Sequence, residues 1–133
     1  MKLNDIGIDS DSSKLGRLFI HDTGIKVRIS MLGNSDYISY FREITEPDRD
    51  KFRDGTISEE KINEYTKRAI AEKIVRNWEN VEDDNGDPIP YTPEFGFECF
   101  MDPKFKKFYQ WILVISEDEL NYRQGNIQKA VKN

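Results

Sequence analysis

Histidine and cysteine, the side chains that most often supply catalytic bases, nucleophiles and metal ligands, each occur only once in this sequence. His21 lies beside a turn, so any mechanism that needs an imidazole has to use a residue in an ordinary turn position. Cys99 lies in an apolar stretch, where a thiol behaves as a small buried hydrophobic group. The G-x-S-x-G motif of serine hydrolases is missing. We therefore expect a protein that is not an enzyme and uses no cofactor.

Long apolar segments are also lacking, which bears on where the protein acts. No run approaches the roughly 18 apolar residues of a membrane span, and residues 1–13 are polar and acidic, without the apolar centre of a signal peptide. A single cysteine cannot form a disulfide within the chain, which fits a reducing compartment. We expect a cytoplasmic protein with no membrane partner.

Positive charge is in deficit. The sequence has 20 Lys and Arg against 25 Asp and Glu, a formal net charge of −5. An average surface of this sign repels phosphate backbones, so nucleic acid is not an expected partner. The one cluster that mixes basic and aromatic residues, at 104–109, is more typical of the solvated side of a helix than of a nucleic-acid platform.

The acidic turn at residues 82–87 invites a calcium interpretation, because hard cations bind clustered carboxylates. The spacing does not fit an EF-hand. With Gly86 in the sixth loop position, Val81 would be first and Thr92 last, where the motif needs a carboxylate and a bidentate Glu. We expect no metal site of this type, and the possibility that the turn binds a cation in another way stays open.

The patterns that are present predict a helix-dominated α+β fold, with an N-terminal β-hairpin packed on a bundle of about four helices. Apolar and polar residues alternate on both sides of an Asp-Thr-Gly turn, which predicts a hairpin over residues 17–30. Helical spacing and capping residues predict helices over 35–45, 58–79, 93–101 and 103–120. Pro47 fits the start of a further short helical segment, 48–53. We expect one globular domain over residues 16–124, a flexible arm over 1–15 and a flexible tail over 125–133.

Aromatic residues are concentrated in one half of the chain, with nine of them from Trp78 to Trp111. A core explains most of these rings, but a small domain has few interior positions for so many, and leftover aromatic patches mark interfaces. Residues 111–115 are all apolar, so this level of the last helix is hydrophobic on every side. Either the segment is central to the core or one side contacts a partner. The candidate contact residues are Phe105, Tyr109, Trp111 and Val114.

A second pattern extends from a tryptophan through the acidic turn to a helix cap, WENVEDDNGDPIPYTPE at residues 78–94. It resembles a signature of the tail assembly chaperones of long-tailed bacteriophages. The similarity continues in Asn34 to Tyr37, in DPKFKKF at 102–108 and in Asn121-Tyr122-Arg123, so that it covers most of residues 16–125. The signature residues make the scaffold rather than an activity, and they are Trp78, Gly86, Pro88, Pro90, Tyr91 and Pro93.

The resemblance implies a protein of the bacterial host cytoplasm that coats apolar helical segments of the tape-measure protein and recruits tail-tube subunits. In many such families a ribosomal frameshift also produces a longer form, and an end at Asn133 would suit the shorter one. A homo-oligomer is left open. The alternative is a structural virion protein, of the tail or the connector, that forms a ring through its β-hairpin. An enzyme or a nucleic-acid regulator is disfavoured by the missing residues and the negative charge.

Overall fold

A three-stranded antiparallel sheet lies at the centre of the computed structural model, which describes residues 1–126. The strands are β1 (Arg17–Ile20), β2 (Lys26–Ile29) and β3 (Val75–Glu79), in the order β1-β2-β3. The first two form the expected hairpin, closed by hydrogen bonds of 2.8 and 2.9 Å between the main chains of His21, Gly24 and Ile25. The third strand joins from far along the chain and gives the marginal hairpin the partner it needs.

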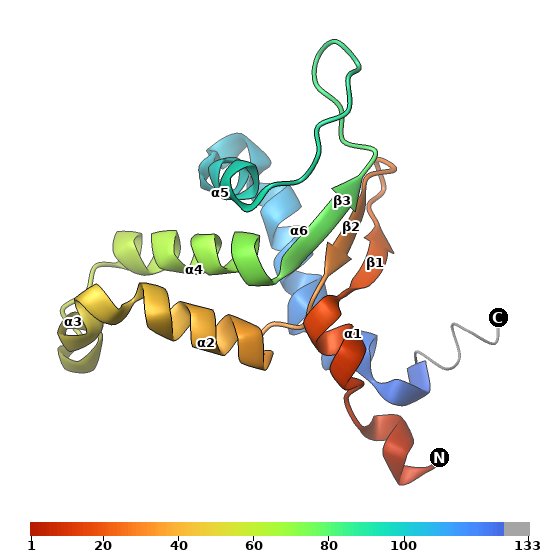
Figure 1. Ribbon diagram of the computed structural model, residues 1–133, viewed down its shortest axis with the longest axis horizontal. Coiled ribbons are helices and arrows are strands. Elements are labelled where there is room, and N and C mark those ends of the chain that lie inside the picture. Colours follow the sequence, from red (N-terminus) through yellow and green to blue (C-terminus); the bar gives the residue numbers. More distant parts are fainter. Residues whose placement is uncertain (127–133) are drawn as a thin grey trace.

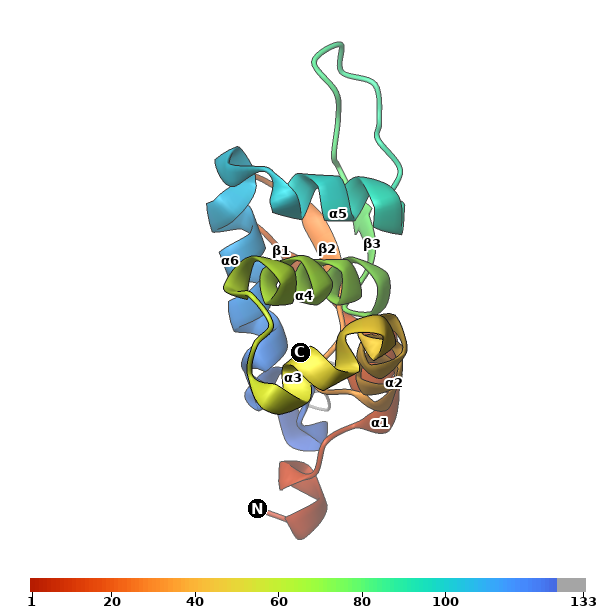
Figure 2. The ribbon, with the colours of Figure 1, turned by 90° about the vertical axis from the view of Figure 1, so that its left-hand side faces the viewer.

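Helices surround the sheet, and the prediction of a helix-dominated α+β fold is confirmed. Helices α2 and α4 lie side by side, with α3 at the end away from the sheet, so that the three form an arm (Figure 1). Helix α5 packs on α4, and α6 packs against β2 (Figure 2). In chain order the helical elements are η1 (Leu3–Ile6), α1 (Ser10–Leu15), α2 (Ser35–Ile44), η2 (Glu46–Asp48), α3 (Arg49–Asp54), α4 (Glu59–Lys73), α5 (Pro93–Met101), η3 (Pro103–Phe105), α6 (Lys106–Glu117) and η4 (Glu119–Tyr122).

Three of these helices begin at side-chain caps that the sequence made visible. Asn34, Ser58 and Thr92 precede α2, α4 and α5, and each side chain accepts a hydrogen bond from a main-chain amide three residues later, at 3.0 to 3.1 Å. Such a cap satisfies an N–H group that has no partner within the helix. The caps fix where the arm and α5 start relative to the sheet.

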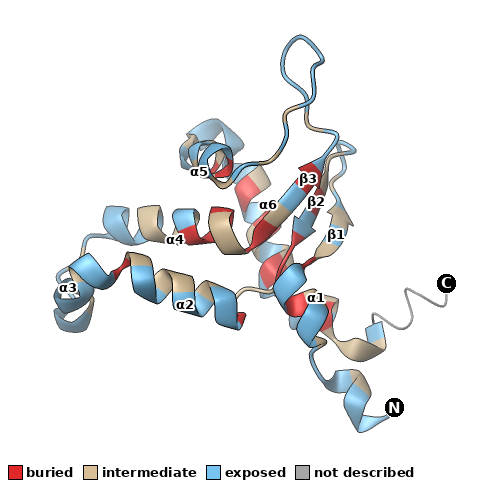
Figure 3. Ribbon diagram, in the orientation of Figure 1, coloured by how far each residue is buried: buried red, intermediate tan, exposed pale blue. Residues whose placement is uncertain are grey.

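The core lies where β2, β3, α4 and α6 meet, as the buried segments in Figure 3 show. Apolar residues from all four elements, together with one from α5 and one from η4, are almost fully removed from solvent. They are Val27, Ile29, Ile70, Ala71, Ile74, Val75, Trp78, Phe100, Tyr109, Ile112 and Tyr122. Burial of each large side chain contributes on the order of 1.5–3 kcal/mol.

One helix prediction was wrong at its end. The expected helix over 58–79 stops at Lys73, and residues 75–79 form β3. The β2–β3 pairing shifts register, because Arg28 pairs with Asn77 whereas the next residue, Ile29, pairs with Val75. Arg76 therefore has no opposing residue on β2. A bulge of this kind moves the following side chains to the other face of the strand. It allows Val75 and Trp78, three residues apart, both to face the core.

The N-terminal region also differs from the expectation of a loose arm. Residues 1–15 contain η1 and α1, and the segment pairs with the other end of the described chain. Ile8 forms an isolated antiparallel bridge with Arg123, the Asp9 amide donates to the Tyr122 carbonyl at 2.8 Å, and the Gln124 amide donates to the Gly7 carbonyl at 2.8 Å. The expected tail over 125–133 lies outside the described residues from position 127 onward.

Candidate functional site: an aromatic groove

An apolar cavity of about 330 Å³ opens beside the end of the sheet. It lies between the β1–β2 turn, the end of β3, the loop at 80–92, α5 and the start of α6. We call it the aromatic groove. Its lining consists of His21, Thr23, Ile25, Trp78, Val81, Glu82, Ile89, Phe95, Cys99, Phe105 and Phe108. A concave site with mostly apolar walls and a few polar groups is typical of a binding site.

Trp78 is the residue that fixes the inner wall of the aromatic groove. It is 5% exposed, and its indole N–H donates a hydrogen bond of 2.8 Å to the Ile89 carbonyl. The ring meets Tyr91 and Phe95 edge to face, at centroid distances of 4.9 and 5.9 Å. Aromatic pairs in this geometry add roughly 0.5–1.5 kcal/mol to the burial of their surface. One side chain therefore holds β3, the returning loop and α5 together.

The acidic turn forms a small ordered projection above the aromatic groove, visible as the loop at the top of Figure 1. Glu82 and Pro88 form an isolated antiparallel bridge, and the Asp83 carboxylate accepts the amides of Asn85 and Asp87 at 2.9 and 3.0 Å. Gly86 has a φ of +83°, a conformation that side chains rarely adopt. The hydrogen bonds of the Asp83 carboxylate therefore stabilise the turn itself. Among residues 1–126, no three His, Cys, Asp or Glu side chains are placed to hold a metal ion together.

Tyr91 connects the exit of the loop to α4 and α5. Its hydroxyl donates a hydrogen bond to the Ala71 carbonyl, and its side chain lies so close to Gly96 that a methyl group there would meet the hydroxyl oxygen at 2.6 Å and ring carbons at 2.7 and 2.9 Å. Burial raises the Tyr91 pKa far above its ordinary value, so the hydroxyl stays a donor. Pro93 begins α5 directly after the loop. Pro88 and Pro90 flank Ile89, whose amide donates to the Val81 carbonyl at 2.8 Å.

His21 closes the aromatic groove at the β1–β2 turn and packs against α6. Its ring meets Trp111 and Phe108 edge to face, at 4.9 and 5.7 Å. Its Nδ1 atom lies 2.8 Å from the Thr23 hydroxyl and 2.9 Å from the Asp22 carboxylate. Both neighbours belong to the turn itself, so the single histidine orders the turn and seals one wall.

The structure places the four candidate contact residues in different surroundings. Phe105 lines the aromatic groove and is 37% exposed, whereas Trp111 packs on His21. Tyr109 is 7% exposed and belongs to the core, and Val114 is 67% exposed but lines neither the aromatic groove nor the cavity beside α4. The apolar run at 111–115 therefore has a buried side, at Ile112, and an open side, at Val114.

Sequence reasoning missed several groove residues. Ile25, Val81 and Ile89 gave no signal of their own, because an apolar residue in a turn or loop looks the same whether it lines a groove or supports the core. Cys99, on α5, was expected only as a small buried hydrophobic group. Burial raises the pKa of the Cys99 thiol, with the nearby Asp102 and Glu98 carboxylates adding to the effect. A protonated thiol is a poor nucleophile, so Cys99 contributes apolar surface to the wall.

A family model described as "YdaY prophage protein" matches residues 32–133, more than half of the chain. The matched region contains α2 to α6, β3 and most of the groove lining, but not the β1–β2 hairpin. No curated protein and no solved structure among those compared matches the chain. Within the described residues, no helix has the length and apolar character needed to cross a membrane.

Proposed function

The chain belongs to the YdaY prophage protein family and is thus a phage-related protein, and on that premise we propose that it is a non-catalytic tail assembly chaperone. In this proposal it binds apolar segments of the tape-measure protein and recruits tail-tube subunits in the cytoplasm of the bacterial host. The aromatic groove is the observation that carries the binding step. The tail-tube step rests on the resemblance of residues 78–94 to the chaperone signature.

The aromatic groove supports this role because apolar surface is left open at its rim. Phe95 and Phe105 line it and are 36% and 37% exposed, although both lie beside a well-packed core. A partner side chain that covers them removes apolar area from water, at about 25 cal/mol for each Å². Helical segments of another protein can lay their apolar face into a groove of this kind.

Acidic residues around the aromatic groove predict a further property of the partner segment. Glu82 lines the aromatic groove, Asp84 and Asp87 lie on the projecting loop, and Asp22 lies in the adjacent turn. Asp84, Asp87 and Glu82 take part in none of the ion pairs in the described part of the chain. An acidic rim attracts basic groups and repels acidic ones. The segments bound best would be apolar and flanked by Lys or Arg.

Co-expression with the tape-measure protein of the same phage tests the proposal. The wild-type chain should keep the tape-measure protein soluble and copurify with it, and Phe105→Asp should abolish copurification by placing a charge in the apolar wall. Ile62→Asp is the matched control, because Ile62 is also 37% exposed but lies on α4, outside the aromatic groove. Loss of the tape-measure protein to the insoluble fraction with the wild-type chain present would reject the chaperone role.

One observation favours the alternative role of a structural virion protein. Strand β1 is at the edge of the sheet, and its outward residues Leu18 and Ile20 are 41% and 67% exposed. An exposed edge strand with apolar residues is a template for pairing with another chain. Mass spectrometry of purified particles separates the two roles, because a chaperone should be absent from them and a ring component should be present in several copies.

A further inference from the structure

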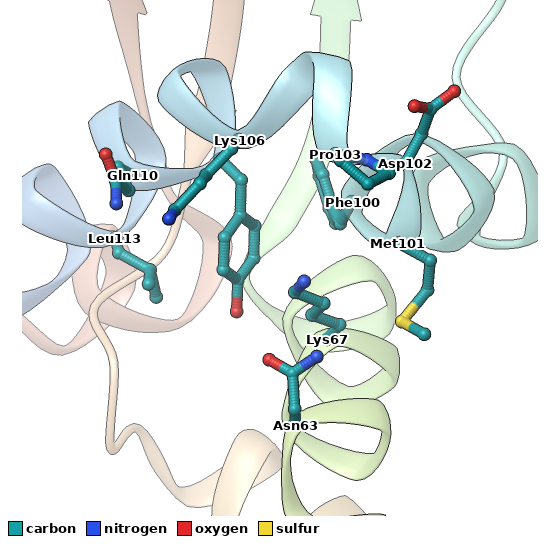
Figure 4. A pocket seen from close by; sticks show the side chains of 10 residues that line it. Asn63, Lys67, Phe100, Met101, Asp102, Pro103, Lys106, Gln110 and Leu113 are labelled. Carbon is teal, nitrogen blue, oxygen red and sulfur yellow. The ribbon is translucent and has the colours of Figure 1, made fainter. Parts of the chain in front are cut away.

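A second cavity, of about 360 Å³, lies on the other side of α5, between α4 and the start of α6. Figure 4 shows that Asn63 and Lys67 approach it from α4, while Lys106, Gln110 and Leu113 approach it from α6. It shares none of its lining residues with the aromatic groove. We call it the lysine pocket.

Tyr109 gives the lysine pocket an unused donor. The residue lines the pocket and is 7% exposed, yet its hydroxyl makes no hydrogen bond within residues 1–126. The other two deeply packed tyrosines differ, since Tyr91 and Tyr122 donate to the carbonyls of Ala71 and Ile29. Arg123 Nε is the one fully enclosed side-chain polar atom without a partner in this part of the chain, so the Tyr109 hydroxyl is not sealed in protein. The hydroxyl therefore keeps some accessible surface, and the residue that carries it lines the pocket.

Two ammonium groups accompany that hydroxyl. Neither Lys67 nor Lys106 lies within 4.0 Å of a carboxylate in the region the structure describes. The Lys67 ammonium lies 5.2 Å from the centre of the Tyr109 ring, on α4 opposite α6. Asp102 is the one acidic residue of the lining. Its carboxylate already has a partner in Lys104, because it accepts a hydrogen bond from the Lys104 amide at 3.1 Å and lies 3.9 Å from the Lys104 ammonium group. Within residues 1–126, the two ammonium groups and the Tyr109 hydroxyl are therefore left without a carboxylate partner.

Apart from the Asn63 and Gln110 amides, the rest of the lining is apolar. Phe100, Met101, Pro103 and Leu113 form the walls around the polar groups. Sites for small organic ligands have this composition, with predominantly apolar walls and a few polar groups that fix orientation, and volumes from about 300 Å³ upward. A fully hydrated inorganic anion would leave these walls without a partner. A ligand with an apolar body and one anionic end satisfies both parts of the lining.

We propose that the lysine pocket binds an organic carboxylate, whose oxygens accept hydrogen bonds from Lys67, Lys106 and the Tyr109 hydroxyl while its apolar body packs on Phe100 and Leu113. The ligand is a free small molecule or a carboxylate carried by a protein segment. The Asn63 and Gln110 amides are close enough to the opening to contact the rest of the ligand. Charge-assisted hydrogen bonds of this kind are about twice as strong as neutral ones.

The test uses 3-phenylpropionate and its neutral isostere 3-phenylpropanamide, added to the full chain and followed by heteronuclear NMR. The carboxylate should shift the signals of Lys67, Lys106 and Tyr109, and the amide should bind about tenfold more weakly or not at all. Lys67→Gln and Lys106→Gln should each weaken binding about tenfold, and Tyr109→Phe, which removes only the hydroxyl, by a few-fold. Lys107→Gln is the matched control, because Lys107 is the next residue along the chain and lies outside the lining.

Unchanged spectra of each variant away from the substituted position establish that the fold is intact. Equal binding of the amide and the carboxylate, or an equal loss in Lys107→Gln, would overturn the proposal, as would shifts confined to residues outside the pocket. Two peptides then distinguish the sources. Tighter binding of a peptide with a Glu between apolar residues, relative to its Gln counterpart, assigns a protein partner, whereas binding of the small carboxylate alone assigns a free ligand.

Discussion

The Trp78 indole N–H donates a 2.8 Å hydrogen bond to the carbonyl oxygen of Ile89, eleven residues later in the chain. This bond closes the loop that carries the acidic turn, and it does so from a side chain that is 5% exposed. The same ring meets Tyr91 and Phe95 edge to face. This side chain of β3 therefore helps to fix the position of the loop, and with it one wall of the aromatic groove, together with the hydrogen bond from the Ile89 amide to the Val81 carbonyl.

Trp78→Phe keeps an aromatic ring but removes the donor, so we expect a loss of about 1–3 kcal/mol in the free energy of unfolding, because the Ile89 carbonyl is left without its partner. Urea denaturation measures it. Trp111→Phe is the control, since the Trp111 side chain is half-buried against His21 and its indole makes no hydrogen bond within the described chain. Equal losses in the two variants would contradict the role given to the Trp78 bond.

The sequence could predict the hairpin and the helices because each carries a local signal: alternation around an Asp-Thr-Gly turn for β1 and β2, and a cap at Asn34, Ser58 or Thr92 for the helices. Strand β3 carried no such signal. Ile70, Ile74 and Trp78 are spaced by four, as on one side of a helix, and the bulge at Arg76 disturbs the period of two expected for a strand. Pairing with β2, some 48 residues earlier, overrode the local pattern.

The candidate site could be predicted from the sequence only in part, for a related reason. The concentration of aromatic residues lies in the half of the chain that supplies most of the groove lining, and Phe105 lines the aromatic groove, but its contact with a partner stays a prediction. The apolar stripe of the helix predicted over 103–120 does not distinguish Tyr109, in the core, from Phe105, at the rim, because exposure depends on where α5 and the turn of His21 lie. The lysine pocket depends on two helices that only the fold brings together.

Gly96→Ala should destabilise the protein although alanine is the better helix former by about 1 kcal/mol. The new methyl group would lie 2.6 Å from the Tyr91 hydroxyl oxygen and 2.7 Å from a ring carbon. The ring cannot move aside without losing its packing on Trp78 and its hydrogen bond to Ala71. We expect a net loss of roughly 1–3 kcal/mol, the usual cost of overpacking, measured by urea denaturation.

A double variant isolates this clash. Tyr91→Ala is destabilising by itself, but it removes the ring that the methyl group would meet. In the Tyr91→Ala background, Gly96→Ala should therefore be neutral or stabilising, and the coupling energy between the two sites should exceed about 1 kcal/mol. Additive losses would mean that the close approach of Tyr91 to Gly96 does not explain why a glycine is present in α5.

Hydrogen exchange tests the pairing of the N-terminal segment with the other end of the described chain. The Asp9 and Gln124 amides donate to main-chain carbonyls of the opposite segment at 2.8 Å, and we expect both to exchange more slowly than the Asp84 amide, for which no hydrogen bond is found in the described structure. Removing residues 1–8 should speed exchange at Gln124, because its acceptor on Gly7 is lost. Exchange at Gln124 as fast in the full chain as in the truncated one would show that the pairing does not persist in solution.

Cys99 reports on occupancy of the aromatic groove. Burial raises the pKa of its thiol, so the thiolate fraction near neutral pH is small and labelling by iodoacetamide should be slower than that of a free cysteine. A segment bound in the groove should slow labelling further, because Cys99 lines it. Mass spectrometry follows the adduct. In the Phe105→Asp variant, addition of the tape-measure segment should leave the rate unchanged, and slowing there as in the wild type would place the segment elsewhere.

Alkaline pH should unfold the protein through its buried tyrosines. Tyr122 is fully buried and donates to the Ile29 carbonyl at 2.8 Å, and burial raises its pKa well above the ordinary 10.0. The folded state therefore keeps a proton that the unfolded chain releases near pH 10, so the stability due to this group is complete below that pH and falls as the pH rises above it. The free energy of unfolding should fall by up to about 1.4 kcal/mol per pH unit for each such tyrosine.

Tyr122→Phe is less stable at neutral pH but has no proton to lose at this position. Urea denaturation between about pH 9 and pH 11 should give the variant a shallower decline than the wild type, and parallel declines would mean that Tyr122 ionises as readily in the folded state as in the unfolded one.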